Sequence, residues 1–254
     1  MAISLEELVG VLDSELKIRE FRDMSLNGLQ IEGAPNIQKI CTSVDAGESV
    51  VLAAIQQRAH VLIVHHGLFW GSPLAIRGSH KRVVKAALDN GLSLYACHLP
   101  LDAHQEWGNN FCLARMLGLS ELKSGALYDG MFIGCVAENV GARTFDELCT
   151  ILKQLPGAPT NFVTLPFGPQ IPRKLCIVSG GGADTIRQAE ADGFDTLITG
   201  EPKQYLYHYA RERSLNVVCA GHYATETVGV QALGNMLATK FGVEHVFVPE
   251  PTGI

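Results

Sequence analysis

Short apolar runs typical of β-strands alternate with helical segments twice along this chain of 254 residues. The first series predicts strands at 40–44, 61–64 and 94–97, and helices at 48–58 and near 81–88. The second predicts strands at 175–178, 196–199 and 216–219, and helices at 184–192 and 204–213. Such alternation is typical of βαβ units, in which helices connect parallel strands and cover the sheet. The sequence therefore predicts an α/β fold with mainly parallel sheets flanked by helices.

The two series are related to each other by position. Residues 40–66 align without a gap onto residues 175–201, which pairs Cys41 with Cys176. Both series also end alike, with a histidine, three residues and an acid: His98 to Asp102, and His222 to Glu226. Each is followed by a glycine and a predicted helix, at 108–117 and 229–237. We interpret this pattern as an internal duplication that gives two related α/β halves. The predicted divisions are a first half at 1–123, a connecting region with short strands and a helix at 124–170, and a second half at 171–254.

Two adjacent histidines, His65 and His66, stand at the end of the apolar run 61–64. The end of a buried strand brings side chains to the rim of a sheet, where open α/β folds usually bind ligands. Successive residues of a strand point to opposite faces, so both imidazoles can meet only if the strand turns there. Gly67 permits such a turn.

The histidine pair and the two His-x-x-x-acid clusters offer imidazole nitrogen and carboxylate oxygen as ligands. This mixture suits one or two divalent ions of Zn, Fe or Mn and does not suit Cu(I). Pro100 disfavours a helical conformation at Leu99, so we expect His98 and Asp102 in a loop. A carboxylate on such a loop is suited to bridging two ions.

Composition excludes several classes of protein. A hydrophobic fraction of 47% with 18% charged residues suits a well-buried globular chain. The net charge of −6 argues against nucleic acid or an anionic membrane as a partner held by a bulk basic surface. We expect neither a membrane helix nor a signal peptide, and a cytoplasmic location. The seven cysteines include no CxxC pair, so those in apolar runs are expected to be buried core residues, with Cys97 also a neighbour of the site.

Six segments of the sequence resemble the GTP cyclohydrolase I type 2 homologue family, also called Nif-three-like dinuclear metal proteins. The resemblance covers nearly the whole chain in order, and the segments are specific in combination. They are SLNGLQ at 25–30, VLIVHHGLFWG at 61–71, HLPLDAH at 98–104, SGGGAD at 179–184, ITGE at 198–201 and GHYATE at 221–226.

The resemblance implies a two-domain α/β protein with two metal ions in the cleft between its lobes, assembled as a toroidal homohexamer. His98 falls on a histidine beside the metals. The implied metal ligands, all of the expected residue type here, are His65, His66, Asp102, His222 and Glu226.

Two classes of function remain open. One is a metal-dependent hydrolase of a nucleotide or small heterocycle, with His98 or Glu201 moving protons. The family name implies attack on the imidazole carbon of the GTP purine with release of formate. The other is a non-enzymatic metal-binding assembly with a storage or regulatory role.

Several residues near the expected site have two interpretations each. The loop Gly180–Gly182 is either a phosphate cradle or a turn required by close packing. Glu201 lies either in the cleft near the metals or on the surface. Asn27 is either a turn former or a polar group of the site, and Trp70 packs in the core or an interface or stacks on a planar substrate.

Overall fold

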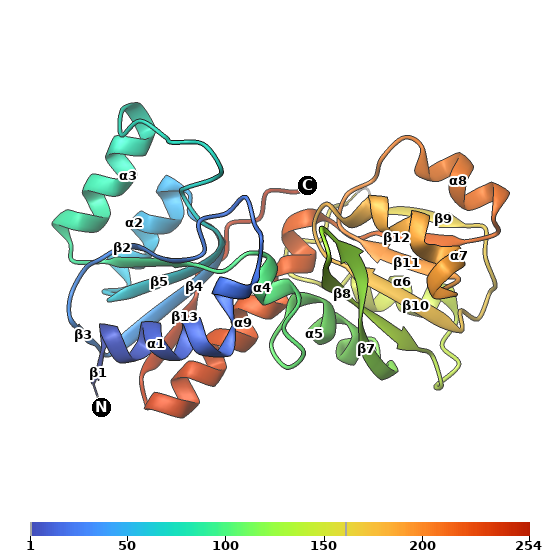
Figure 1. The fold of residues 1–254 in the computed structure, drawn as a ribbon, viewed down its shortest axis with the longest axis horizontal. Coiled ribbons are helices and arrows are strands. Elements are labelled where there is room, and N and C mark those ends of the chain that lie inside the picture. The colour runs from blue at the N-terminus through green and yellow to red at the C-terminus, as the bar shows by residue number, and fades with distance from the viewer. Residues whose placement is uncertain (1, 161) are drawn as a thin grey trace. The chain divides into compact units, whose positions relative to one another are not determined.

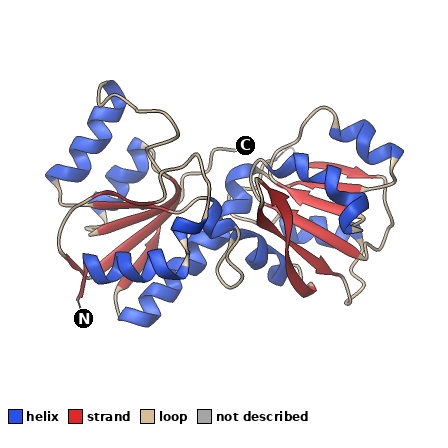
Figure 2. Ribbon diagram, in the orientation of Figure 1, coloured by secondary structure: helices blue, strands red, loops and turns tan. Residues whose placement is uncertain are grey.

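The computed structural model describes residues 2–160 and 162–254 and contains two compact units. Unit 1 comprises the chain up to Leu101 together with Val230–Glu250. Unit 2 comprises Asp102–Gly229 and Pro251–Ile254. Each unit has a sheet with helices packed on it (Figures 1 and 2), which confirms the predicted α/β class.

The sheet of unit 1 has five strands in the order β13-β4-β5-β6-β2. Strands β13, β4, β5 and β6 run parallel, and β2 closes the edge in the antiparallel direction. The strands span Gly28–Ile31 (β2), Lys39–Asp45 (β4), Val61–His66 (β5), Ser93–Ala96 (β6) and Glu244–Phe247 (β13). A separate two-stranded ribbon pairs Ile3–Ser4 (β1) with Asn36–Ile37 (β3).

The first helix of unit 1 begins at an N-terminal signal in the sequence. Helix α1 (Leu5–Glu15) starts after Ser4, whose hydroxyl accepts a hydrogen bond from the Glu7 amide at 3.1 Å, as expected of an N-cap. The other elements are η1 (Ile18–Glu20), α2 (Glu48–Gln56) and α3 (Gly78–Asp89). Apolar faces of α2 and α3 pack with β4, β5 and β6 in one buried cluster.

The sheet of unit 2 has six strands in the order β7-β8-β10-β11-β12-β9. The central strands β10, β11 and β12 are parallel, whereas β7, β8 and β9 pair antiparallel. The strands span Ser120–Tyr128 (β7), Met131–Glu138 (β8), Val163–Pro166 (β9), Lys174–Val178 (β10), Thr196–Thr199 (β11) and Asn216–Cys219 (β12). The helices are α5 (Asn109–Met116), α6 (Phe145–Leu152), η2 (Gly182–Gln188), α7 (Ala189–Asp192) and α8 (Leu206–Glu212).

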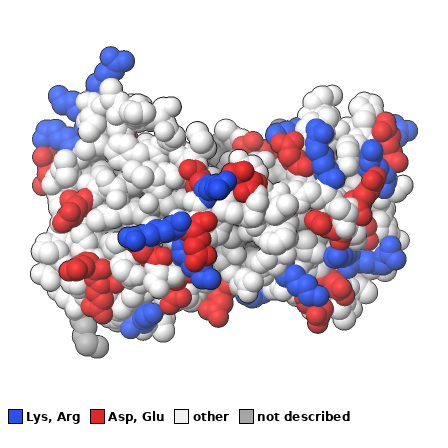
Figure 3. All heavy atoms as spheres, viewed as in Figure 1, with Lys and Arg blue, Asp and Glu red and all other residues white. Residues whose placement is uncertain are grey.

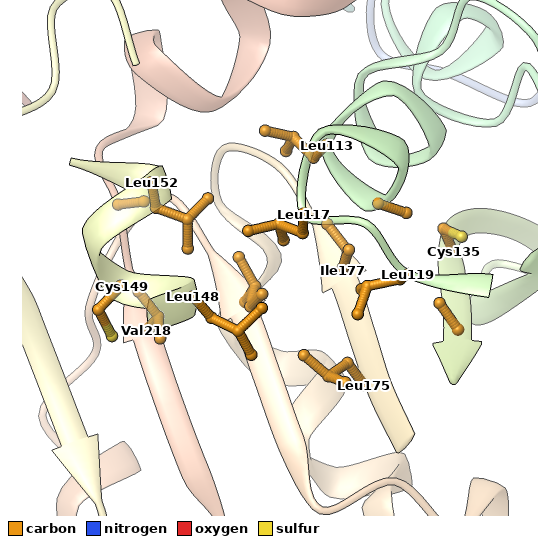
Figure 4. Close-up of a cluster of buried hydrophobic side chains, with 14 of the residues drawn as sticks. Leu113, Leu117, Leu119, Cys135, Leu148, Cys149, Leu152, Leu175, Ile177 and Val218 are labelled. Carbon is orange, nitrogen blue, oxygen red and sulfur yellow. The ribbon is translucent and has the colours of Figure 1, made fainter. Parts of the chain in front are cut away.

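Strand β10 is buried on both faces. Leu175 and Ile177 pack with α5 and α6, where Leu117 and Leu148 project toward the strand (Figure 4). The alternate residue Cys176 packs on the other side in the cluster that includes η2, α7 and α8. A strand covered on both faces needs apolar side chains at successive positions, which explains the unbroken apolar run in the sequence.

Both sheets contain the same four-strand arrangement. The parallel series β4-β5-β6 is followed at its edge by antiparallel β2, and the series β10-β11-β12 by antiparallel β9. The offset in residue number that aligns 40–66 with 175–201 also aligns the residues of β2 with those of β9. The shared strand order agrees with an internal duplication.

The bounds of the units differ from the predicted halves. Residues 124–170 are part of unit 2, because β7, β8 and β9 complete its sheet. Conversely, Val230–Glu250 belongs to unit 1, because β13 pairs with β4. The chain passes between the units within α4 (Leu99–Asp102), within α9 (His222–Phe241) and again after Glu250.

The last two features concern the length of the helices and the charges on the surface. Within residues 2–160 and 162–254, no helix combines the length and apolarity needed to cross a membrane. On the face shown in Figure 3, Lys and Arg side chains are interspersed with Asp and Glu.

Candidate metal centre

His65 and His66 are the last two residues of β5, so the strand continues through both. Their ring centroids lie 4.7 Å apart, so the imidazoles converge although successive strand residues ordinarily point to opposite faces. Gly67 follows directly, and a side chain there would collide with Gln30 and Ala96. The strand therefore brings the two imidazoles together without ending before His66, and close packing explains the glycine at position 67.

Each of these two histidines is oriented by a hydrogen bond from its Nδ1 atom. His65 is fully buried and contacts the carbonyl oxygen of Cys97 at 2.9 Å. His66 contacts a carboxylate oxygen of Asp45 on the neighbouring strand at 2.8 Å. Carbonyl and carboxylate oxygens only accept, so Nδ1 donates in both cases and Nε2 carries the lone pair.

His98 follows β6 and is held at two points. Its backbone amide donates to the Asn27 side chain at 2.7 Å, and its Nδ1 atom donates to Asp23 at 2.9 Å. Asp23 is 3% exposed and also accepts from the amides of Ser25 and Leu99 and from the side chain of Asn27. Burial opposes ionisation of Asp23, but the hydrogen bond and charge of His98, with those other donors, lower its pKa to about 2.

These three histidines form one cluster within unit 1. The His98 ring centroid lies 5.1 Å from that of His65 and 5.6 Å from that of His66. One nitrogen from each ring can be chosen such that all three lie within 4.8 Å of one another. Trp70 borders the cluster at 5.0 Å from the His98 ring centroid, and its indole N–H donates to the Gly67 carbonyl at 2.8 Å. Trp70 is 38% exposed and therefore lies at the edge of the cluster, not in the core.

Asp102 is the last residue of the short helix α4, not of a loop as predicted. Pro100 lies in the first turn of this helix, where no intrahelical N–H is needed and proline is tolerated. The Asp102 side chain is buried, and its Oδ1 atom accepts from Asn109 at 2.8 Å and from the Ser179 hydroxyl at 3.0 Å. These two donors fix the carboxylate in one orientation.

His222 and Glu226 lie in the first two turns of α9. The helix begins at His222, whereas the sequence predicted a start at Gly229. Gly229 lies inside this helix, and the position is a glycine because a Cβ there would lie 2.4 Å from the side-chain oxygen of Asn109. The spacing of four residues places His222 and Glu226 on one helix face, with Nε2 to Oε1 at 3.2 Å.

Two carboxylates flank the His222 ring. Its Nδ1 atom donates to Glu201 at 2.6 Å, which places Glu201 beside this candidate ligand, in agreement with the first of its two interpretations. Burial disfavours the charged imidazole, but the bonds and charges of Glu226 and Glu201 outweigh it and raise the His222 pKa to about 9. Glu226 is nearly fully buried, whereas the Glu201 side chain is 41% exposed.

The loop after β10 gathers the candidate ligands of unit 2. Ser179 bonds Asp102, and the next residue, Gly180, lies against Glu226 and His222. A Cβ on Gly180 would lie 2.2 Å from Glu226 Oε1 and 2.8 Å from His222 Nε2. Gly180 also has a φ of +58°, a left-handed conformation that favours glycine.

The same loop fits close packing better than a phosphate cradle. The Gly180 amide donates to the Thr225 hydroxyl at 3.0 Å, so this amide is already engaged. A side chain on Gly182 would collide with Val178, whereas one on Gly181 would meet no atom within 4 Å. Two of the three glycines are therefore explained by packing.

The donor set fits divalent transition-metal ions. All four imidazoles donate Nδ1–H to an oxygen acceptor, the arrangement that fixes Nε2 as the metal-binding nitrogen in metalloproteins. Asp102 and Glu226 add the anionic oxygens that a mixed nitrogen and oxygen site for Zn, Fe or Mn needs. The unit 1 and unit 2 residue groups each have this chemistry.

Sequence reasoning missed the residues that orient these side chains. Asp45 ends a buried strand and had a recognisable signal, because a carboxylate at a strand end beside His66 suits a ligand-orienting role. Asp23 and Asn109 carried no such signal, since their partners are not apparent from the local pattern. Of the two interpretations of Asn27, the structure supports the polar group of the site.

Comparisons with known proteins show the family of the chain. The family model Duf34/NIF3 (NGG1p interacting factor 3) matches residues 3–253. A Deinococcus radiodurans protein named GTP cyclohydrolase 1 type 2 homolog is 41% identical over 254 residues, covering 99% of this chain and 95% of that protein. An Archaeoglobus fulgidus protein of the same name is 40% identical over 252 residues, covering 99% of this chain and 100% of that protein.

A solved structure shows a similar fold. The crystal structure of a Thermus thermophilus protein matches with a TM-score of 0.91 and 41% identity, covering 99% of this chain and 100% of that one. The family match and the full-length relatives lead to one conclusion: this chain belongs to the Duf34/NIF3 family, as the six sequence segments indicated.

Proposed function

We propose that this protein is a metal-dependent hydrolase of a nucleotide or small heterocycle. In this proposal it holds two divalent transition-metal ions, with Zn, Fe and Mn as the candidates. The single observation that carries the proposal is the shared Nδ1–H orientation of the four imidazoles, which directs Nε2 of each ring toward metal binding, as the hydrogen-bond acceptors behind the ligands do in metalloproteins. The proposed ligands are His65, His66, Asp102, His222 and Glu226.

Bound ions would supply Lewis acidity, which favours hydrolysis at neutral pH. The chain's own residues would orient the ligands and move protons. Asp45 and Glu201 hold the His66 and His222 rings, and Asn109 and Ser179 hold the Asp102 carboxylate. The partial exposure of Glu201 suits proton exchange with solvent, so it is a proposed proton carrier together with His98.

The names of the relatives suggest the first substrate to test. Several are called GTP cyclohydrolase 1 type 2 homolog, which supports GTP as a candidate and hydrolysis at the imidazole carbon of its purine as the candidate reaction. Release of formate is the measurable product of that reaction. We also propose the homohexamer, which light scattering of the purified chain measures directly.

The test is a hydrolysis screen of metal-loaded protein against GTP, other nucleotides and pterins. We expect formate from GTP, no formate from His66→Ala, and full release from the control His60→Ala. His60 is a suitable control because it precedes β5 and its Nδ1 accepts from the Lys39 amide, unlike the site histidines. Hydrolysis of another small molecule would change the substrate and keep the hydrolase. If ions bind and no substrate turns over, the hydrolase is excluded in favour of a storage or regulatory assembly.

A further inference from the structure

An exposed tryptophan borders the histidines of unit 1. Trp70 is 38% exposed, and its ring centroid lies 5.0 Å from that of His98 and 5.8 Å from that of His66. A large aromatic side chain stabilises a protein mainly by burying its apolar surface, so an exposed one leaves part of that surface for another molecule. A molecule that covers the Trp70 ring would therefore lie beside two residues of the candidate metal centre.

The position of the Trp70 ring is fixed by contacts within unit 1. The indole N–H donates to the Gly67 carbonyl at 2.8 Å, so this nitrogen already has its partner. The backbone of Trp70 also forms an antiparallel bridge with Ser25, and hydrogen bonds of 2.6 Å and 3.0 Å on either side of the bridge join the two loops. Side chains lie closest together in a pair of this kind, and the small serine leaves room for the indole. The ring therefore loses little conformational freedom when a ligand binds.

The two tryptophans of the chain differ in what covers their faces. His104 stacks on Trp107, with 4.5 Å between the ring centroids and 9° between the ring planes. By contrast, the planes of His66 and His98 are inclined to the Trp70 indole by 48° and 71°, so neither lies flat on it. Within the described residues, the chain thus supplies a stacked ring for Trp107 and none for Trp70.

We propose that Trp70 binds a planar heteroaromatic ring of the substrate, such as a purine or a pterin, which stacks on the indole beside His66 and His98. This inference deepens the proposed function and rests on it for the reaction that follows binding. Stacking on an aromatic side chain accepts many different bases, because each has a π-face. The site would therefore select substrates by the presence of a flat ring and exclude sugars, phosphate esters and peptides that lack one.

Charge near the indole favours an uncharged ring over a phosphate group while no ion is bound. Asp23 and Asp45 accept hydrogen bonds from the two histidines that neighbour Trp70, so carboxylates lie directly behind both imidazoles. Carboxylates repel a phosphate group and leave a neutral heterocycle unaffected. We therefore expect a neutral nucleoside to bind the metal-free protein through its base.

The first experiment measures the fluorescence of the metal-free full chain carrying Trp107→Phe. The chain has two tryptophans, so Trp70 is then the only source of indole emission. Guanosine and ribose are the probes, because they share the sugar and differ in the base. We expect saturable quenching by guanosine and none by ribose, since a purine stacked on an indole quenches its emission. No quenching by guanosine, or equal quenching by ribose, would overturn the inference.

The second experiment compares guanosine affinity among variants by calorimetry. Trp70→Leu should weaken binding by about 5- to 150-fold, whereas Trp70→Phe keeps a flat ring and should retain most of the affinity. Trp107→Leu is the matched control and should bind guanosine like the unchanged protein, because His104 already covers that indole. Equal affinity in Trp70→Leu and the unchanged protein would contradict the proposal. If circular dichroism shows that Trp70→Leu does not fold, the fluorescence titration decides.

A second copy of the chain is the alternative occupant of the exposed indole. A smaller assembly of Trp70→Leu in light scattering, with unchanged guanosine affinity, would show that Trp70 packs in a subunit interface and would overturn the inference. Formate release from GTP with the same KM in Trp70→Leu and the unchanged protein would also reject it and leave the proposed function standing. Guanosine binding that requires Trp70, without turnover of any substrate, would support the ring site and exclude the hydrolase.

Discussion

Gly180→Ala should separate the packing role of the glycine loop from any role in binding phosphate. The new Cβ would lie 2.2 Å from Glu226 Oε1 and 2.8 Å from His222 Nε2, while ordinary contacts exceed 3.4 Å. One methyl group would therefore push both candidate ligands away from their present positions. Metal affinity should fall even though no ligand is removed.

The magnitude has two parts. Alanine in the left-handed conformation at φ +58° costs about 1–2 kcal/mol of folding free energy, which lowers the melting temperature by roughly 2–8 °C for a chain of this size. Displacing Glu226 by about 1 Å exceeds the tolerance of about 0.2 Å on metal-ligand distances. We expect metal affinity to fall by about 10- to 100-fold, as when orienting partners are lost.

Metal affinity is measured by isothermal titration calorimetry of each protein with Zn(II) or Mn(II). The melting temperature of each metal-free protein is measured in a separate thermal melt. Gly181→Ala is the matched control, since a Cβ there meets no atom within 4 Å and its φ is −81°. The control should bind metal and melt like the unchanged protein. Equal metal affinity in Gly180→Ala and the unchanged chain would refute the assignment of Glu226 and His222 as ligands.

Three further predictions follow from the orienting contacts. Asp45→Ala should weaken metal binding about 10- to 100-fold in the same titration, because the His66 ring loses its acceptor, while exposed Asp89→Ala should have no effect. Asn109→Ala should lower the free energy of unfolding in urea by about 1–3 kcal/mol, because buried Asp102 and the Gly229 amide both lose a partner; an unchanged midpoint would contradict this. Because the His222 pKa is raised, its ion pairs should stabilise the metal-free protein fully below about pH 6.5, and this stabilisation should be lost as pH rises through about 9. The measurement is the melting temperature against pH, and the same pH dependence in the unchanged protein and in His222→Gln would contradict the prediction.

Most strands and helices could be predicted from the sequence because the spacing of apolar residues reflects which positions are buried. Strands β4, β5, β10 and β11 lie within a residue or two of their predicted bounds, since apolar runs buried on both faces leave little ambiguity. The helix start at His222 was missed because Gly229 was taken as a boundary. The position is a glycine because the Asn109 side chain packs closely against it, and this contact between distant residues is not apparent from the local sequence.

The candidate ligands could be found by sequence, but the residues that orient them could not. His65, His66 and His222 stand beside other ligand-type residues in sequence, so clustering made them visible. Asp23 acts on His98 across 75 positions, and its role appears only when the strands are paired. The membership of β13 in the sheet of unit 1 could not be predicted for the same reason, because β13 pairs with a strand that is distant in sequence.

Anomalous diffraction from crystals of the full chain grown with Zn(II), Fe(II) or Mn(II) tests the central claim most directly. We predict two metal peaks per chain, each within about 2.0–2.2 Å of ligand atoms drawn from the His65, His66 and His222 Nε2 atoms and the Asp102 and Glu226 carboxylates. Peaks elsewhere in the chain, or none at these side chains when metal is in excess, would contradict it.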